Sequence, residues 1–126
     1  MGIDELLERS RARLRRLTPE QAEAAVRAGA TIVDTRPVEQ RREQGVVPGA
    51  VVVGRNVLEW RADQTSGHGD SALALGAPLI VMCAEGYSSS LAAASLQDCG
   101  LADATDMVGG FLAWRGAGLP VAPCPD

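Results

Sequence analysis

Residues 79–89 read Leu79-Ile80-Val81-Met82-Cys83-Ala84-Glu85-Gly86-Tyr87-Ser88-Ser89. The first four are continuously apolar and follow Pro78, which is typical of a strand buried on both faces of a parallel sheet. A Gly-containing loop ends this strand, and residues 90–99 are predicted to form a helix that stops at Gly100. A strand, a tight loop and a helix in this order are the start of a βαβ unit, so the stretch indicates the fold class.

The same alternation continues on both sides of this stretch. Further strands are expected at 31–33, 50–53 and 106–108, and helices at 3–16, 18–29, 38–44, 56–61 and after Gly109-Gly110. Thr18, Pro19 and Gln21 form the signature of a capping box with proline at the first helical position. We therefore predict a single α/β domain, with a mainly parallel central sheet flanked by helices on both faces. It divides into an N-terminal helix (1–17), a core (18–122) and a tail (123–126).

Composition excludes several classes of protein. The chain has 126 residues, 46% of them hydrophobic, and a net charge of −4. All twelve basic residues are arginines, and the nine before Gly45 are interleaved with eight acids. This balance indicates a salt-paired helix surface and argues against nucleic-acid binding. No apolar run approaches the roughly 20 residues of a membrane span, and no signal-peptide pattern opens the chain, so a cytoplasmic location is expected.

The chain has three cysteines, Cys83, Cys99 and Cys124, and one histidine, His68. This sparse, odd count predicts neither a disulfide framework nor a metal site. A Cys–His dyad is equally disfavoured, so a reactive cysteine needs another source of activation. Cys83 has one: a loop that turns into a helix N-terminus directs backbone N–H groups inward and lowers a thiol pKa. An inert, buried strand-end cysteine is the alternative interpretation.

Four signatures follow one another in the chain. They are Asp34-Thr35-Arg36 after a strand, Val47-Pro48-Gly49-Ala50, the Cys83 loop, and Gly109-Gly110 followed by Trp114 and Gly118-Leu119-Pro120-Val121. In this order, over about residues 17–122, the sequence resembles a rhodanese-like domain, and its loop most resembles that of small single-domain thiosulfate sulfurtransferases.

The resemblance implies a mechanism. The Cys83 thiolate would take the outer sulfur of a small-molecule donor, such as thiosulfate or a persulfide, as a persulfide and pass it to a thiol or to cyanide, with no metal or organic cofactor. The substrate and persulfide cradle would be Ala84, Glu85, Gly86, Tyr87, Ser88 and Ser89. Neither nucleic acid nor membrane is an expected partner, and the oligomeric state is left open.

Three positions depart from the family pattern: Val46 stands where histidine is frequent, Ser88 where arginine is frequent, and Glu85 where some thiosulfate users have a cation. Glu85 opposes a dianionic donor, so thiosulfate is expected to be a poor substrate and another persulfide to be the natural donor. Arg55 is the candidate for the missing positive charge, whereas Asp34 and Arg36 are predicted to support the loops. A non-catalytic binding or redox-sensing module is the alternative function. Phosphatase activity is disfavoured, because no arginine lies between Ala84 and Arg115 to clamp an oxyanion.

The remaining candidates receive minor roles. Trp60 and Tyr87 are possible walls of the pocket, and His68 is expected in solvent. Cys99 is predicted on the buried face of its helix, and Cys124 in an exposed tail.

Overall fold

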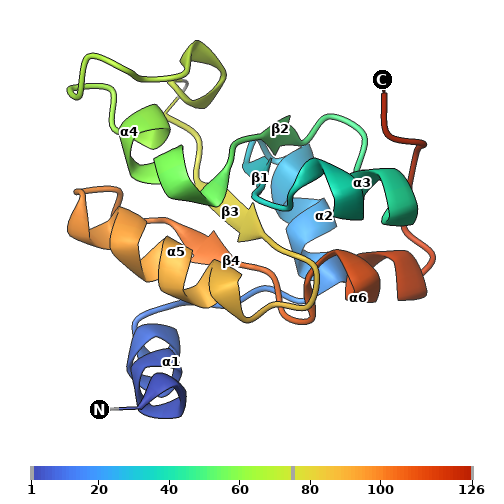
Figure 1. The fold of residues 1–126 in the computed structure, drawn as a ribbon, viewed down its shortest axis with the longest axis horizontal. Coiled ribbons are helices and arrows are strands. Elements are labelled where there is room, and N and C mark those ends of the chain that lie inside the picture. The colour runs from blue at the N-terminus through green and yellow to red at the C-terminus, as the bar shows by residue number, and fades with distance from the viewer. Residues whose placement is uncertain (1, 75, 126) are drawn as a thin grey trace.

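The computed structural model describes residues 2–74 and 76–125 (Figure 1). It has an alternating α/β order, as predicted. The elements are α1 (Ile3–Ala12), α2 (Pro19–Arg27), β1 (Thr31–Asp34), α3 (Val38–Gln44), β2 (Val51–Val52), η1 (Arg55–Val57), α4 (Leu58–Ala62), η2 (Ser71–Leu73), β3 (Leu79–Met82), α5 (Ser88–Asp98), β4 (Thr105–Asp106) and α6 (Gly110–Gly116).

The sheet is parallel and has the order β2-β1-β3-β4. β3 lies inside it, and all four of its residues are buried, which explains why the strand has no polar alternation. Val33 of β1 pairs with Val81 of β3 and, on the other side, with Val51 of β2. The carboxyl ends of β1 and β3 therefore lie side by side, and the loops that follow them form one edge of the sheet.

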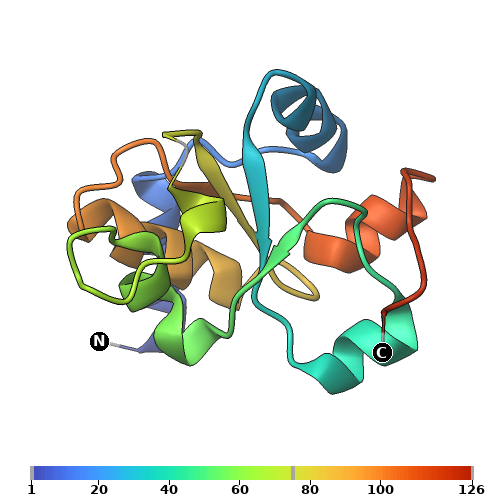
Figure 2. The same cartoon turned by 90° about the horizontal axis from the view of Figure 1, so that it is seen from above.

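Helices cover both faces of the sheet, which confirms the predicted layers (Figure 2). On one face, Leu58 of α4 and Leu96 of α5 pack against Val81. On the other face, Phe111 and Trp114 of α6 pack with Ala22 of α2 against the sheet. The alternate residues of β3 divide between these two clusters, as the period of a strand requires.

The capping box at the start of α2 is confirmed. The Gln21 N–H donates to the Thr18 hydroxyl at 3.2 Å, and the Thr18 N–H donates to the Gln21 side chain at 2.9 Å. Several other boundaries differ from the prediction. α5 begins at Ser88 rather than residue 90, and β4 is Thr105–Asp106 rather than 106–108. The expected helix at 56–61 is divided into η1 and α4.

The N-terminal helix is shorter than the predicted 3–16. It ends at Ala12, and a turn at Arg13 followed by an irregular stretch, 14–16, leads to Leu17. Leu17 forms a parallel bridge to Met107: its N–H donates to the Asp106 carbonyl at 3.0 Å, and its carbonyl accepts from Val108 at 2.8 Å. α1 packs against α5, although the two helices are far apart in the sequence (Figure 1).

Candidate active site

The loop after β3 forms one wall of a cavity of about 300 Å³ at the carboxyl edge of the sheet. The loop between β1 and α3 forms the other wall. The lining residues are Thr35, Arg36, Pro37, Gln40, Cys83, Ala84, Glu85, Tyr87 and Ser88. The structure thus brings together most of the loop predicted from the sequence. Gly86 and Ser89 are buried behind this surface.

Cys83 is a free thiol, 8% exposed, at the floor of the cavity. The Gly86 N–H donates to its Sγ at 3.2 Å. Burial raises the pKa of Cys83, but hydrogen bonds from Ser89, Ser88 and the backbone N–H groups of Ser89 and Gly86 lower the pKa more, so the net change is downward. This direction favours the thiolate, which is the nucleophilic form of cysteine.

Ser89 has a second partner. Its hydroxyl carries one proton and donates to the Asp106 carboxylate at 2.8 Å. While that bond persists, the donors available to a thiolate are the Ser88 hydroxyl and the two backbone N–H groups. We therefore attribute the lowered pKa of Cys83 mainly to those groups.

The loop is held against the start of α6 by close backbone packing. Gly86 has φ +86°, and a Cβ at this position would lie 2.7 Å from the Gly109 nitrogen. A Cβ on Gly110 would collide with the carbonyl oxygen of Cys83. The Phe111 N–H donates to that same oxygen at 2.8 Å. The Gly109-Gly110 signature therefore has a physical reason, since only glycine permits this approach.

Asp34 and Arg36 have fully buried side chains and bind each other. Arg36 Nη2 and Nε donate to the two Asp34 oxygens at 2.7 and 3.0 Å. Two further bonds, to Gln44 Oε1 and the Gly45 carbonyl, use other N–H groups of the same guanidinium. The guanidinium also lies 3.9 Å above the centre of the Phe111 ring. Although Arg36 borders the cavity, its charge is neutralised there, and this geometry fits the structural support that we predicted.

Arg55 is not among the residues that line the cavity. Its guanidinium donates to both oxygens of Glu59 at 3.0 Å, one helical turn further along the chain. Glu59 in turn accepts a 2.6 Å hydrogen bond from Ser95 of α5. Arg55 thus helps to fasten α4 to α5, and the geometry gives no support for the predicted role in substrate binding.

The other candidates are dispersed. Tyr87 lines the cavity and is 59% exposed, whereas Trp60 is 55% exposed and lies outside it. His68 is exposed, as expected. The prediction for Cys99 was wrong: it follows the last residue of α5 and is exposed. Cys124 is half-buried rather than exposed as predicted, because its sulfur lies against Arg41, 4.0 Å from Nη1.

Two larger cavities, of about 430 and 580 Å³, lie elsewhere. The first includes Cys99, but burial, followed by the nearby carboxylates Glu59, Asp63 and Asp98, raises the pKa of this thiol. The second is lined mainly by apolar residues and contains no cysteine. Chemistry rather than size therefore selects the Cys83 cavity.

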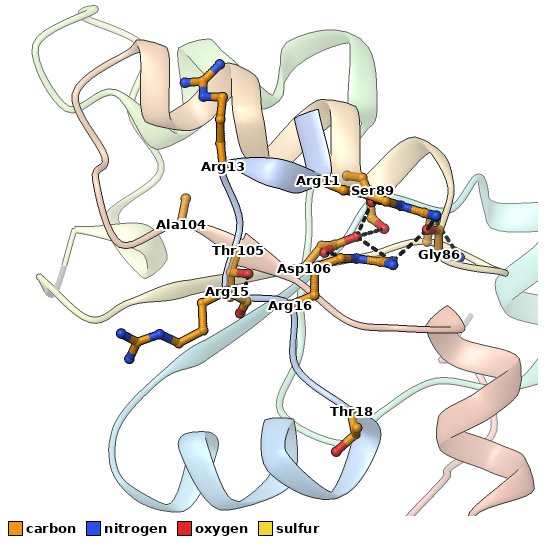
Figure 3. Close-up of polar contacts among 12 residues, drawn as sticks. Arg11, Arg13, Arg15, Arg16, Thr18, Gly86, Ser89, Ala104, Thr105 and Asp106 are labelled. Atoms are coloured by element: carbon orange, nitrogen blue, oxygen red, sulfur yellow. Dashed lines mark hydrogen bonds and ion pairs between the residues drawn. The ribbon is translucent and has the colours of Figure 1, made fainter. Parts of the chain in front are cut away.

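The sequence analysis missed three residues that contact the Cys83 loop from behind, that is, on the side away from the cavity. Arg11 and Arg16 both reach the Gly86 carbonyl, and Asp106 binds the first turn of α5 (Figure 3). No local pattern marks them, since more than 65 residues of chain separate each arginine from Gly86.

No group of three or more histidine, cysteine or carboxylate side chains is arranged to hold a metal ion within 2–74 and 76–125. A membrane-spanning helix is also absent from that part of the chain.

Comparison with known proteins is consistent with this geometry. The family model described as rhodanese-like domain matches residues 18–117. Thiosulfate sulfurtransferase GlpE of Pseudomonas savastanoi pv. phaseolicola is 31% identical over 101 residues, which cover 80% of this chain and 87% of that protein. The GlpE of Pseudomonas fluorescens strain SBW25 is 35% identical over 102 residues, covering 80% and 84%.

Among solved structures, a Rhodopseudomonas palustris protein of unknown function is similar, with a TM-score of 0.88 and 32% identity over 96% of this chain and 94% of that one. It is described as a possible tyrosine phosphatase.

Proposed function

Because the chain belongs to the rhodanese-like domain family, we propose that it is a sulfurtransferase that carries sulfane sulfur on Cys83. The observation that carries this proposal is the Cys83 thiol itself. It lies at the floor of a small cavity, accepts a hydrogen bond from the Gly86 N–H at 3.2 Å, and has a lowered pKa. The cytoplasmic location expected from the sequence stays a prediction.

In the first step, the Cys83 thiolate attacks the outer sulfur of the donor. A new S–S bond forms at Cys83 while the donor's own bond to that sulfur breaks. The electron pair leaves with the remainder of the donor, as a thiolate or, from thiosulfate, as sulfite. The terminal sulfur of the persulfide is then an anion, to which the loop N–H groups and the Ser88 hydroxyl would donate.

In the second step, a thiolate or cyanide attacks the terminal sulfur. The S–S bond at Cys83 breaks, and Cys83 leaves as a thiolate. A thiol with a low pKa is the better leaving group, so the same hydrogen bonds assist both steps. In each step one S–S bond or donor bond breaks as another bond forms, and the electron pair leaves with the departing group. The cycle therefore needs no metal or organic cofactor.

The cavity favours a donor with little negative charge. Glu85 borders it as an exposed carboxylate, and the bordering cation, Arg36, is neutralised by Asp34. A dianion such as thiosulfate would approach a carboxylate without a compensating charge in the cavity wall. We propose a low-molecular-weight persulfide as the preferred donor and a thiol as the acceptor.

Intact-mass spectrometry without reductant tests the proposal. The protein is incubated with thiosulfate or with a small-molecule persulfide, and Cys83→Ala is treated in parallel. We expect the mass of one sulfur atom to be added to the wild type alone and removed by cyanide. Addition from neither donor, in a folded protein with a free Cys83, would refute the sulfurtransferase function and favour the binding or redox-sensing module.

The description of the Rhodopseudomonas palustris relative makes phosphatase activity the second candidate to test. Phosphoryl transfer at a cysteine loop needs cationic groups directed at the phosphate oxygens. The loop from Ala84 to Ser89 contains no arginine. Arg11 and Arg16 bind the Gly86 carbonyl and do not line the cavity. We therefore expect no hydrolysis of p-nitrophenyl phosphate above that of Cys83→Ala.

A further inference from the structure

The family match begins at residue 18. Two arginines of the segment before it contact the back of the Cys83 loop (Figure 3). Arg11 Nη2 and Arg16 Nη2 donate to the Gly86 carbonyl oxygen at 2.8 and 2.9 Å. This oxygen has two lone pairs, so the two guanidiniums satisfy it fully. Hydrogen bonds from charged donors are roughly twice as strong as neutral ones. The carbonyl is therefore held in one direction by two strong bonds.

The direction of this carbonyl determines the direction of the next N–H. In a trans peptide the carbonyl of one residue and the N–H of the next point to opposite sides. With the Gly86 carbonyl turned towards the arginines, the Tyr87 N–H points away from them. On the other side of Gly86, its own N–H already donates to Cys83 Sγ at 3.2 Å. The two arginines thus fix the orientation of the peptide between Gly86 and Tyr87, which directly follows this donor.

Asp106 anchors one of the arginines. Its carboxylate is fully buried and accepts from Arg16 Nε at 2.9 Å and from Nη2 at 3.2 Å. It also accepts from the Ser89 and Ser90 hydroxyls at 2.8 and 2.7 Å, in the first turn of α5. The parallel bridge between Leu17 and Met107 places Arg16 beside Asp106. Sheet pairing therefore sets the position of Arg16.

Arg11 brings a charge that no described carboxylate neutralises. Its Nε donates to Ser90 Oγ at 3.1 Å, and its guanidinium lies 5.4 Å from the centre of the Tyr87 ring. No ion pair of Arg11 with a carboxylate occurs in the described part of the chain. Together, the Arg11 and Arg16 guanidiniums and the Asp106 carboxylate carry a net charge of +1.

We propose that Arg11 and Arg16 are positioning residues for Cys83: they orient the Gly86–Tyr87 peptide and provide, from behind, the positive charge that the loop sequence lacks. The role in sulfur transfer rests on the function proposed above. Neither arginine lines the cavity, so we expect both to act through the loop rather than by contact with the substrate. The N-terminal segment is accordingly part of the active-site scaffold.

The test is the pH profile of Cys83 alkylation by iodoacetamide. All variants of the full chain carry Cys99→Ser and Cys124→Ser, so that Cys83 is the one thiol that reacts. Arg11→Gln and Arg16→Gln remove the two contacts. Arg13→Gln is the matched control, because Arg13 belongs to the same segment but binds Asp98 at 2.6 Å and points away from the loop (Figure 3).

We expect the profiles of Arg11→Gln and Arg16→Gln to move to higher pH and that of Arg13→Gln to coincide with the parent. At neutral pH the alkylation rate should fall about threefold, because a lower thiolate fraction is partly offset by higher intrinsic nucleophilicity. Arg11→Lys should restore part of the rate, because it retains the charge. A folded Arg11→Gln with the parent profile would overturn the proposal.

Arg11→Gln is the deciding variant if Arg16→Gln fails to fold, since Arg16 neutralises the buried Asp106 and Arg11 does not. Alkylation does not require sulfur transfer, so the two proposals fail separately. A wild type that forms no persulfide, yet shows the arginine-dependent profile, would refute the function and leave the positioning role. Persulfide formation by the wild type, together with unchanged alkylation profiles in the arginine variants, would support the function and refute the positioning role.

Discussion

Gly86→Ala tests whether close packing of the Cys83 loop against α6 controls the chemistry. A Cβ at residue 86 would lie 2.7 Å from the Gly109 nitrogen and 3.2 Å from the Gly110 nitrogen. Ordinary contact begins at 3.4 Å, so the two backbones would have to separate by about 0.7 Å. Both neighbouring atoms belong to the backbone, and neither can turn aside as a side chain would.

The energy of this change has two parts. An alanine at φ +86° costs roughly 1–2 kcal/mol because its Cβ crowds the following carbonyl. Forcing the extra methyl into a packed interface costs a further 1–3 kcal/mol or so. Gly49→Ala separates the two parts, because Gly49 has φ +84° and a Cβ there would meet nothing within 4 Å.

Thermal unfolding and the rate of sulfur transfer to cyanide are measured on both variants. We expect Gly86→Ala to be less stable than Gly49→Ala by about 1–3 kcal/mol. If the loop moves instead, the bond from the Gly86 N–H to Cys83 is lost, and displacements of this size can reduce a rate by about 100-fold. Equal stability and equal rates for the two variants would refute the argument from packing.

Three other predictions follow from the same structure. Arg36→Met should lower the free energy of unfolding in urea by about 3–5 kcal/mol, because it leaves the Asp34 carboxylate buried and unpaired; a loss below about 1 kcal/mol would contradict this. Because the pKa of Cys83 is lowered and that of Cys99 is raised, peptide mapping should find Cys83 alkylated at lower pH than Cys99, and the reverse order would exclude an activated Cys83. Glu85→Gln should accelerate sulfur transfer from thiosulfate several-fold with little effect on a persulfide donor, since it removes one repulsive charge; equal effects on both donors would refute that role.

The fold was largely predictable, because its determinants are local. Four consecutive apolar residues before Cys83 identify the central strand, and the Thr18 capping box places the start of α2. Cys83 was singled out as the candidate nucleophile by its place between a strand and a helix, and the structure has that same order of β3, loop and α5. These features depend on residues a few positions apart, and such patterns are visible in one sequence.

The positions of some side chains differ from the prediction, because spacing along the chain is a weak signal for them. Cys99 shares a helical spacing with Leu96, yet it lies after the last turn, where the chain leaves the core, and is exposed. Arg55 follows a strand that points towards the site, but Glu59 lies one turn further along and captures its guanidinium. Competition between partners decides the position of a long charged side chain, and spacing alone does not show which partner prevails.

The sequence alone predicted the central strand, Cys83 as the candidate nucleophile and the loop that we propose as the persulfide cradle. The tertiary structure decided how that loop is held. Gly86 lies against Gly109, and its carbonyl is bound by Arg11 and Arg16, which precede it by 75 and 70 residues. These contacts exist because Leu17 pairs beside β4 and α1 packs on α5. Such long-range pairings arise only when the sheet assembles, so no pattern within a short window of residues could predict them.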